Sequence, residues 1–162
     1  AWVGGFGDAE RTLKIMKDPA CGPIGVLSLI IICILKWSAI YLLLQKQMYI
    51  ALLLFPVLGR VAPLILFLTT NYVRAQGLGS SIASTMPRKS AWLLVMVIVC
   101  GSFYFAWLGL IACMSMLIGL WYLRRKFIQR IGGITGDTVG ASIEIVECIS
   151  LLAFTMGSFY LR

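Results

Sequence analysis

Histidine is absent from this 162-residue sequence, and acidic residues are scarce, with 6 Asp and Glu against 14 Lys and Arg. Without histidine, the chain alone cannot build a Ser-His-Asp triad, a histidine-ligated metal centre or a histidine general base. Charged residues make up only 12% of the sequence, about half their share in a typical soluble domain. These shortages exclude histidine-based catalysis within the chain and an ordinary soluble domain.

Hydrophobic residues, in contrast, make up 60% of the sequence and form several uninterrupted runs. This pattern predicts an all-α fold, a polytopic helical integral membrane protein. We expect about five transmembrane helices and an N-terminal surface helix in one membrane-embedded domain, 1–162. The expected parts are a cytoplasmic or interfacial segment, 1–20, and spans at 21–44, 48–70, 91–106, 108–123 and 140–161.

Two features of the cysteines and the first residues limit other interpretations. No cysteine pair has CxxC spacing, and the cysteines lie mostly in apolar runs, where they are interpreted as small buried hydrophobic side chains. The chain begins Ala1-Trp2-Val3, without an initiator Met or a basic signal-peptide region. We therefore expect a piece of a longer protein whose N-terminal part is missing. The cysteines are Cys21, Cys33, Cys100, Cys113 and Cys148.

The first segment is too polar to cross a bilayer. Asp8 is suited to N-cap a short amphipathic helix that lies on the membrane surface. Asp18-Pro19 should end that helix, because a residue before proline disfavours the helical conformation. The span 48–70 contains Pro56 and Pro63, so we expect an interrupted helix there.

The charge distribution predicts the topology. Residues 91–123 carry no charge and as one helix would be about 50 Å long, against about 30 Å of hydrocarbon. Two short helices that turn back near 105–109 place the flanking basic clusters on one side, as the positive-inside rule favours. This topology places every acid at or near the cytoplasmic surface, namely Asp8, Glu10, Asp18, Asp137, Glu144 and Glu147.

A glycine-rich stretch, 132–144, lies between the last basic cluster and the last apolar run. Its glycines can turn the backbone and let it approach a ligand closely. Asp137, Glu144 and Glu147 should lie on roughly one side of the last helix, an arrangement that suits a hard cation such as Mg²⁺. A capping role is a good alternative for Asp137, but it accounts poorly for the two deeper acids.

Lys36 and Arg60 are the basic residues inside apolar runs. Lys36 either snorkels towards the far interface or belongs to a site. Arg60 lies mid-span between two prolines, too deep for easy snorkelling, and we favour a cavity role in which its guanidinium binds a diphosphate or a carboxylate. With the acids, these residues favour Mg²⁺-assisted phosphoryl transfer on a diphosphate ligand.

Two blocks at the ends of the chain resemble motifs of one family. The first reads GDAERTLKIMKDP at 7–19 and continues GPIGV at 22–26; the second reads GGITGDTVGA at 132–141, followed by Glu144. Between them, PVLGR at 56–60, YVR at 72–74 and GLG at 77–79 occur in the same order as in the family. Over nearly its whole length the chain resembles the cobalamin synthase family, the adenosylcobinamide-GDP ribazoletransferases.

The resemblance implies a multi-pass enzyme of the bacterial inner (cytoplasmic) membrane with an active site facing the cytoplasm. Such an enzyme joins adenosylcobinamide-GDP to alpha-ribazole, or its 5'-phosphate, and releases GMP in the last assembly step of the cobalamin nucleotide loop. It depends on Mg²⁺. The expected partners are these substrates and the lipid bilayer; no nucleic acid is expected, and a homo-oligomer is left open. The family carries an acidic His-Asp-Gly-type stretch ahead of the first block, so we expect part of the metal site to lie outside this sequence.

Roles for individual residues follow from the resemblance. Asp18, Asp137 and Glu144 inherit catalytic roles as metal ligands or bases, and the predicted metal-binding set is these three with Glu147. Lys17, Arg60 and Arg74 inherit phosphate-binding roles. The predicted substrate-binding set is Lys17, Arg60, Arg74, Gly133, Thr135, Gly136 and Thr138.

The sequence leaves two other functions to consider. A transporter would place a midplane site at the interrupted span 48–70, but no inverted repeat is evident and the acids gather at one surface. A CDP-alcohol phosphotransferase has similar chemistry, but its signature of aspartates four residues apart on one helix is not present.

Overall fold

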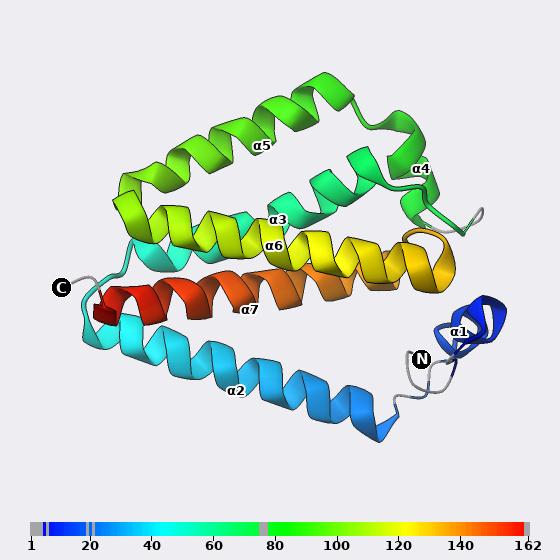
Figure 1. Ribbon diagram of the computed structural model, residues 1–162, viewed down its shortest axis with the longest axis horizontal. Coiled ribbons are helices and arrows are strands. Elements are labelled where there is room, and N and C mark those ends of the chain that lie inside the picture. The colour runs from blue at the N-terminus through cyan, green and yellow to red at the C-terminus, as the bar shows by residue number, and fades with distance from the viewer. Residues whose placement is uncertain (1–4, 6, 19, 21, 75–77, 161–162) are drawn as a thin grey trace.

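The computed structural model describes residues 5, 7–18, 20, 22–74 and 78–160 (Figure 1). Within these residues the chain is helical and has no β-strand beyond one isolated bridge, so the predicted all-α class is confirmed. The elements are α1 (Ala9–Ile15), α2 (Pro23–Gln45), α3 (Ala51–Thr69), α4 (Leu78–Thr85), α5 (Arg88–Ser102), the 3₁₀ turn η1 (Phe103–Phe105), α6 (Ala106–Ile131) and α7 (Gly136–Tyr160). Residues used above that lie outside the described part are Ala1, Trp2, Val3, Pro19, Cys21 and Gly77.

Four stretches of the described chain are long and apolar enough to cross a membrane: α2, α3, the 44 residues from Arg88 to Ile131, and α7. Large apolar side chains on these helices point outward and are exposed, among them Trp37, Leu53 and Leu93. A soluble protein of this size rarely exposes contiguous apolar surface of this kind, whereas a bilayer solvates it. The protein is therefore a polytopic helical membrane protein, as predicted.

The uncharged stretch reverses at η1, slightly before the predicted turn at 105–109. Ala106 has φ 49°, and Gly109 lets α6 return closely, because a Cβ there would collide with the carbonyl of Ser102. In Figure 1, α6 runs back beneath α5 from this turn. α6 then continues beyond the predicted end at 123, since residues 124–131 contain no glycine or proline and the helix ends at Gly132.

α7 occupies the middle of the bundle, packed against α2, α3 and α6 (Figure 1). Phe154 meets Phe55 of α3 edge to face, with ring centroids 5.3 Å apart, a favourable aromatic geometry. Small residues on α7 let the neighbouring helices approach, and their hydroxyls bond within the helix; Ser142, for example, donates to the Val139 carbonyl at 2.7 Å. The buried polar groups of α7 thus need no water.

Two expectations from the sequence are corrected by the helices. α3 is continuous from Ala51 to Thr69 with both Pro56 and Pro63 inside it, so the expected interruption is wrong, and the transporter alternative loses the broken helix on which it depended. Neighbouring helices can stabilise such a helix despite the lost backbone bonds. Cys33 and Cys100 are exposed instead of buried, because they lie on outward faces of α2 and α5.

Basic side chains bind the C-terminal end of α3. Arg124 donates from Nη2 to the Thr69 carbonyl at 2.7 Å and from Nε to the Thr70 hydroxyl at 2.9 Å. Arg88 donates to the Leu68 carbonyl at 2.9 Å. These carbonyls carry the negative end of the helix dipole and lack partners within the helix. These basic side chains therefore anchor α5 and α6 to α3.

Arg124→Gln should lower the free energy of unfolding by about 1–3 kcal/mol, because charge-assisted bonds to the end of α3 are lost. Equilibrium unfolding in bicelles would measure this loss. Arg125→Gln on the adjacent residue is the matched control, since Arg125 stacks on Trp121 instead of binding α3. Equal stability of the two variants would contradict the anchoring role.

Candidate functional site

The glycine-rich stretch connects α6 to α7 through a short backbone bridge. Gly132 ends α6 in the left-handed conformation, with φ 76°. Ile134 then pairs in parallel with Tyr72: its amide donates to the Asn71 carbonyl and its carbonyl accepts from the Val73 amide, both at 2.9 Å. This bridge joins two motif blocks that are far apart in the sequence.

Gly133 is required by that bridge. A Cβ at this position would collide with the carbonyl of Asn71 and approach the Val73 side chain. Gly136, the first residue of α7, is exposed and lies near the Tyr72 hydroxyl. Gly133 thus lets the α6–α7 connection lie against the segment after α3. The predicted contact of both glycines with substrate stays a prediction.

Thr135 and Thr138 form a reciprocal cap at the start of α7. The Thr135 amide donates to the Thr138 hydroxyl at 2.8 Å, and the Thr138 amide donates to the Thr135 hydroxyl at 3.4 Å. The arrangement is that of a capping box in which threonine replaces the usual Glu or Gln. Both residues are buried. The structure therefore gives them a role in positioning α7, and the predicted substrate contacts stay untested.

Arg74 and Asp137 form an ion pair where the two blocks meet. Arg74 Nη1 lies 3.0 Å from Asp137 Oδ2, and Asp137 is in the first turn of α7, where the helix dipole favours an acid. Arg74 Nε and Nη2 are buried and have no hydrogen-bond partner among the described residues. These two atoms share one edge of the guanidinium, the edge that binds a carboxylate or phosphate through two bonds. Asp137 thus orients Arg74, and the other edge of the guanidinium is buried without a partner among the described residues.

A second ion cluster joins α2 to α7 deeper in the bundle. Lys36 Nζ lies 2.7 Å from Glu144 Oε2 and 3.2 Å from Glu147 Oε1. Glu147 is about 16 Å along α7 from its start, deeper than the surface position predicted for every acid. The side chain of Glu144 is 52% exposed, whereas those of Lys36 and Glu147 are 17% and 21% exposed. One ammonium therefore holds two carboxylates, of which only Glu144 is open to a ligand.

α3 completes this cluster through Gly59. A Cβ on Gly59 would lie 3.3 Å from both Cβ and Oε2 of Glu147, so a larger residue would push against the acid. The sequence left Lys36 open between snorkelling and a site, and the structure assigns it to the acids. The only signal for this pairing in the sequence was that charges in apolar helices need partners of opposite sign. Lys36 and Glu144 lie 108 residues apart, so the sequence does not show which charges pair.

The other predicted residues lie away from these two clusters. Asp8 caps α1 as predicted, since Oδ1 accepts from the Arg11 amide at 3.1 Å. Lys17 and Asp18 are exposed beside α1 and line a shallow pocket of about 560 Å³. Asp18 accepts a bond from the Ala20 amide at 2.9 Å. Arg60 is exposed on α3 and forms no ion pair with a described acid.

The predicted metal-binding set is divided in this structure. Among the described residues, no three acids or cysteines come together as a metal site. Asp137 pairs with Arg74, Asp18 lies beside α1, and Glu144 and Glu147 share Lys36. Only the last two converge on one cation, and their hard oxygen donors are of the kind that Mg²⁺ prefers. Two carboxylates fit only part of a Mg²⁺ site, and in this structure Lys36 Nζ contacts both of them.

Comparison with known proteins supplies a family. The family model described as cobalamin-5-phosphate synthase matches residues 1–155. The adenosylcobinamide-GDP ribazoletransferase of Acinetobacter baumannii (strain ACICU) is 55% identical over 161 residues, or 99% of this chain and 65% of the relative. Proteins with the same name from Stutzerimonas stutzeri (strain A1501) and Pseudomonas fluorescens (strain Pf0-1) are 46% and 42% identical, each over 96% of this chain.

The chain spans about 65% of the length of these curated relatives. These relatives are therefore longer than this chain. No solved structure matches.

Lys36→Met should destabilise the protein by about 1–3 kcal/mol, because two carboxylates remain unpaired; the loss is below that of a fully buried pair since Glu144 is half exposed. Unfolding in bicelles would measure it. Combining Lys36→Met with Glu144→Gln and Glu147→Gln should recover most of the stability. If Lys36→Met alone is as stable as the parent protein, the cluster does not link α2 to α7.

Gly133→Ala should cost about 1–3 kcal/mol, the usual range for an overpacked site. Gly140→Ala is the matched control: a Cβ there meets nothing within 4 Å, and alanine favours helix by about 1 kcal/mol. Thermal unfolding of both variants in one detergent would test the bridge. The prediction fails if Gly133→Ala melts at or above the Gly140→Ala temperature.

Proposed function

Because the chain belongs to the cobalamin-5-phosphate synthase family, we propose that it carries part of the active site of an adenosylcobinamide-GDP ribazoletransferase. The reaction joins adenosylcobinamide-GDP to alpha-ribazole, or its 5'-phosphate, with release of GMP. A ribose hydroxyl gives up its proton and forms a new P–O bond, while the P–O bond that links this phosphorus to GMP breaks. The proposal rests on the family and on the edge of the Arg74 guanidinium that has no partner among the described residues.

Arg74 is the residue that this geometry suits to the diphosphate. Asp137 holds Nη1, and the buried Nε and Nη2 atoms have no partner among the described residues. A buried donor without a partner is costly, and two phosphate oxygens would satisfy both donors at once. The cost of orienting the guanidinium is already met by Asp137, so the charge that develops during transfer meets a preorganised donor.

In this proposal one carboxylate accepts a proton and another orients Arg74. Glu144 is half exposed and held in place by Lys36, so its carboxylate is positioned to accept a proton from an attacking hydroxyl. Asp137 orients Arg74. α1, which precedes Asp18, lies at the end of the bundle where α6 passes into α7 (Figure 1). Asp18, Asp137 and Glu144 are the acids that the family resemblance marks as catalytic.

Magnesium belongs to the proposal as a prediction. Glu144 and Glu147 would hold it, with Asp18 and Asp137 as the other predicted ligands. When bound, Mg²⁺ neutralises charge on the diphosphate and polarises the phosphoryl group. Lys17 and Arg60 keep their predicted phosphate-binding roles, and the ribazole acceptor and a homo-oligomer likewise stay predictions from the resemblance.

The proposed location is the bacterial inner membrane with the site facing the cytoplasm. Basic side chains gather at the end of the bundle that holds Arg74 and the start of α7, including Arg88 and Arg124, which bind the end of α3. At the opposite end, Lys46 donates to the Ser158 carbonyl at 2.6 Å. This asymmetry supports the orientation, since positive residues favour the cytoplasmic side.

Full-length protein in lipid vesicles should release GMP from adenosylcobinamide-GDP when alpha-ribazole 5'-phosphate and Mg²⁺ are added. Arg74→Gln should lower kcat by about 10²–10³-fold, as expected when a donor to a developing charge is lost. Chromatography of GMP would measure the rate, and Lys126→Gln, at a residue that packs on Tyr122, controls for the loss of one positive charge. Release no faster than in a metal-free sample would refute the activity; normal release by Arg74→Gln would refute the role of Arg74 alone.

A further inference from the structure

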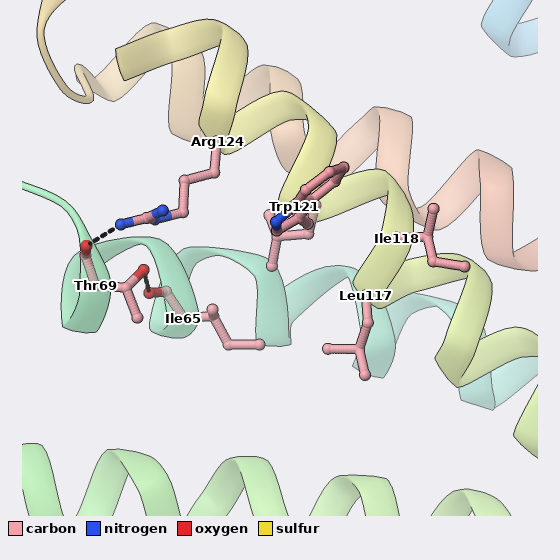
Figure 2. Close-up of a pocket in the computed structure, with 7 residues that line it drawn as sticks. Ile65, Thr69, Leu117, Ile118, Trp121 and Arg124 are labelled. Carbon is pink, nitrogen blue, oxygen red and sulfur yellow. Dashed lines mark hydrogen bonds between the residues drawn. The ribbon is translucent and has the colours of Figure 1, made fainter. Parts of the chain in front are cut away.

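A groove of about 670 Å³ runs between α3 and α6, away from both ion clusters. Figure 2 shows it with Arg124 and Thr69 at one end, Trp121 in the middle, and Leu117 and Ile118 at the other end. The groove extends about 10 Å along α6, from Leu117 to Arg124. It is therefore apolar along most of its length and basic at one end.

The apolar part of the groove faces the bilayer. Ile118 and Trp121 are 61% and 53% exposed, and Leu117 is 39% exposed. Space beside apolar side chains costs packing energy when it is empty and stays poorly hydrated. In a membrane, the available molecule of matching chemistry is a lipid acyl chain.

The basic end of the groove carries charge that no described acid neutralises. Arg124 uses Nε and Nη2 to bind Thr70 and Thr69, which fixes its guanidinium at the groove. The Arg125 guanidinium lies 4.1 Å from the ring centroid of Trp121, which lines the same groove. In the described part of the chain, the ion pairs involve Lys36 and Arg74 instead. Arg124 therefore presents positive charge at the end of the apolar groove, and Arg125 adds a second positive charge against Trp121.

We propose that this groove binds one acidic glycerophospholipid of the adjacent leaflet. Its acyl chain lies along Ile65, Leu117 and Ile118, and its phosphate contacts Arg124 and Arg125. Basic pockets between transmembrane helices bind acidic lipid headgroups through the same combination of charge and apolar contact. A zwitterionic lipid would fill the groove equally well but has no net negative charge to attract the arginines. We therefore expect an acidic lipid.

The test uses full-length protein reconstituted in vesicles of equal phosphatidylglycerol and phosphatidylcholine content. Lipids retained after extraction into detergent are counted by native mass spectrometry. The parent protein should retain phosphatidylglycerol preferentially. Leu117→Trp, which fills the groove, should abolish the preference, and Ile34→Trp on the outward face of α2 is the matched control. Arg125→Gln should reduce the preference about fivefold, the effect of one basic residue near an acidic lipid.

Three results would overturn the proposal. The first is equal retention of the two lipids by the parent protein. The second is an unchanged preference for phosphatidylglycerol in both folded Leu117→Trp and Arg125→Gln. If Leu117→Trp does not fold, the result for Arg125→Gln decides. The third is displacement of the retained lipid by millimolar inorganic phosphate, which would indicate a simple anion site. Charge replacement on α1, Lys14→Gln, controls for a general loss of positive charge and should leave the preference unchanged.

Discussion

Charged and polar groups inside a bilayer need partners within the protein, and the packing around α7 depends on this constraint. Lys36 meets the requirement for Glu144 and Glu147 and thereby joins α2 to α7. Serine and threonine hydroxyls on α7 meet it within their own helix. Without water to compete, each unsatisfied group would cost several kcal/mol. The contact between α2 and α7 is therefore set in part by the pairing of their charged groups.

One isolated β-bridge positions the residues of the candidate site. The bridge between Tyr72 and Ile134 places the segment after α3 beside the start of α7. Arg74 and Asp137 meet as a direct consequence. Gly133 permits the bridge and Thr135 caps the helix that follows, so residues that look like ligand contacts in the sequence act first as structural residues.

The fold and the family were accessible from local signals. Long apolar runs identify the spans, and basic clusters around residues 91–123 indicate the reversal, because both signals lie within a few residues of what they describe. Continuity of α3 was not accessible: two prolines locally oppose a helix, and only packing by its neighbours keeps it intact. The exposure of Cys33 and Cys100 likewise depends on which helix faces are covered.

By itself, the sequence determined that the protein is a helical membrane protein, which family it belongs to and which acids and bases are candidates for chemistry. Only the tertiary structure decided which of these meet. Glu144 and Glu147 pair with Lys36, 108 residues from Glu144. Asp137 orients Arg74, whose Nε and Nη2 have no partner among the described residues. The reason is that composition and periodicity report each helix separately, whereas partners across helices depend on how closely small residues such as Gly59 and Gly133 let the backbones approach.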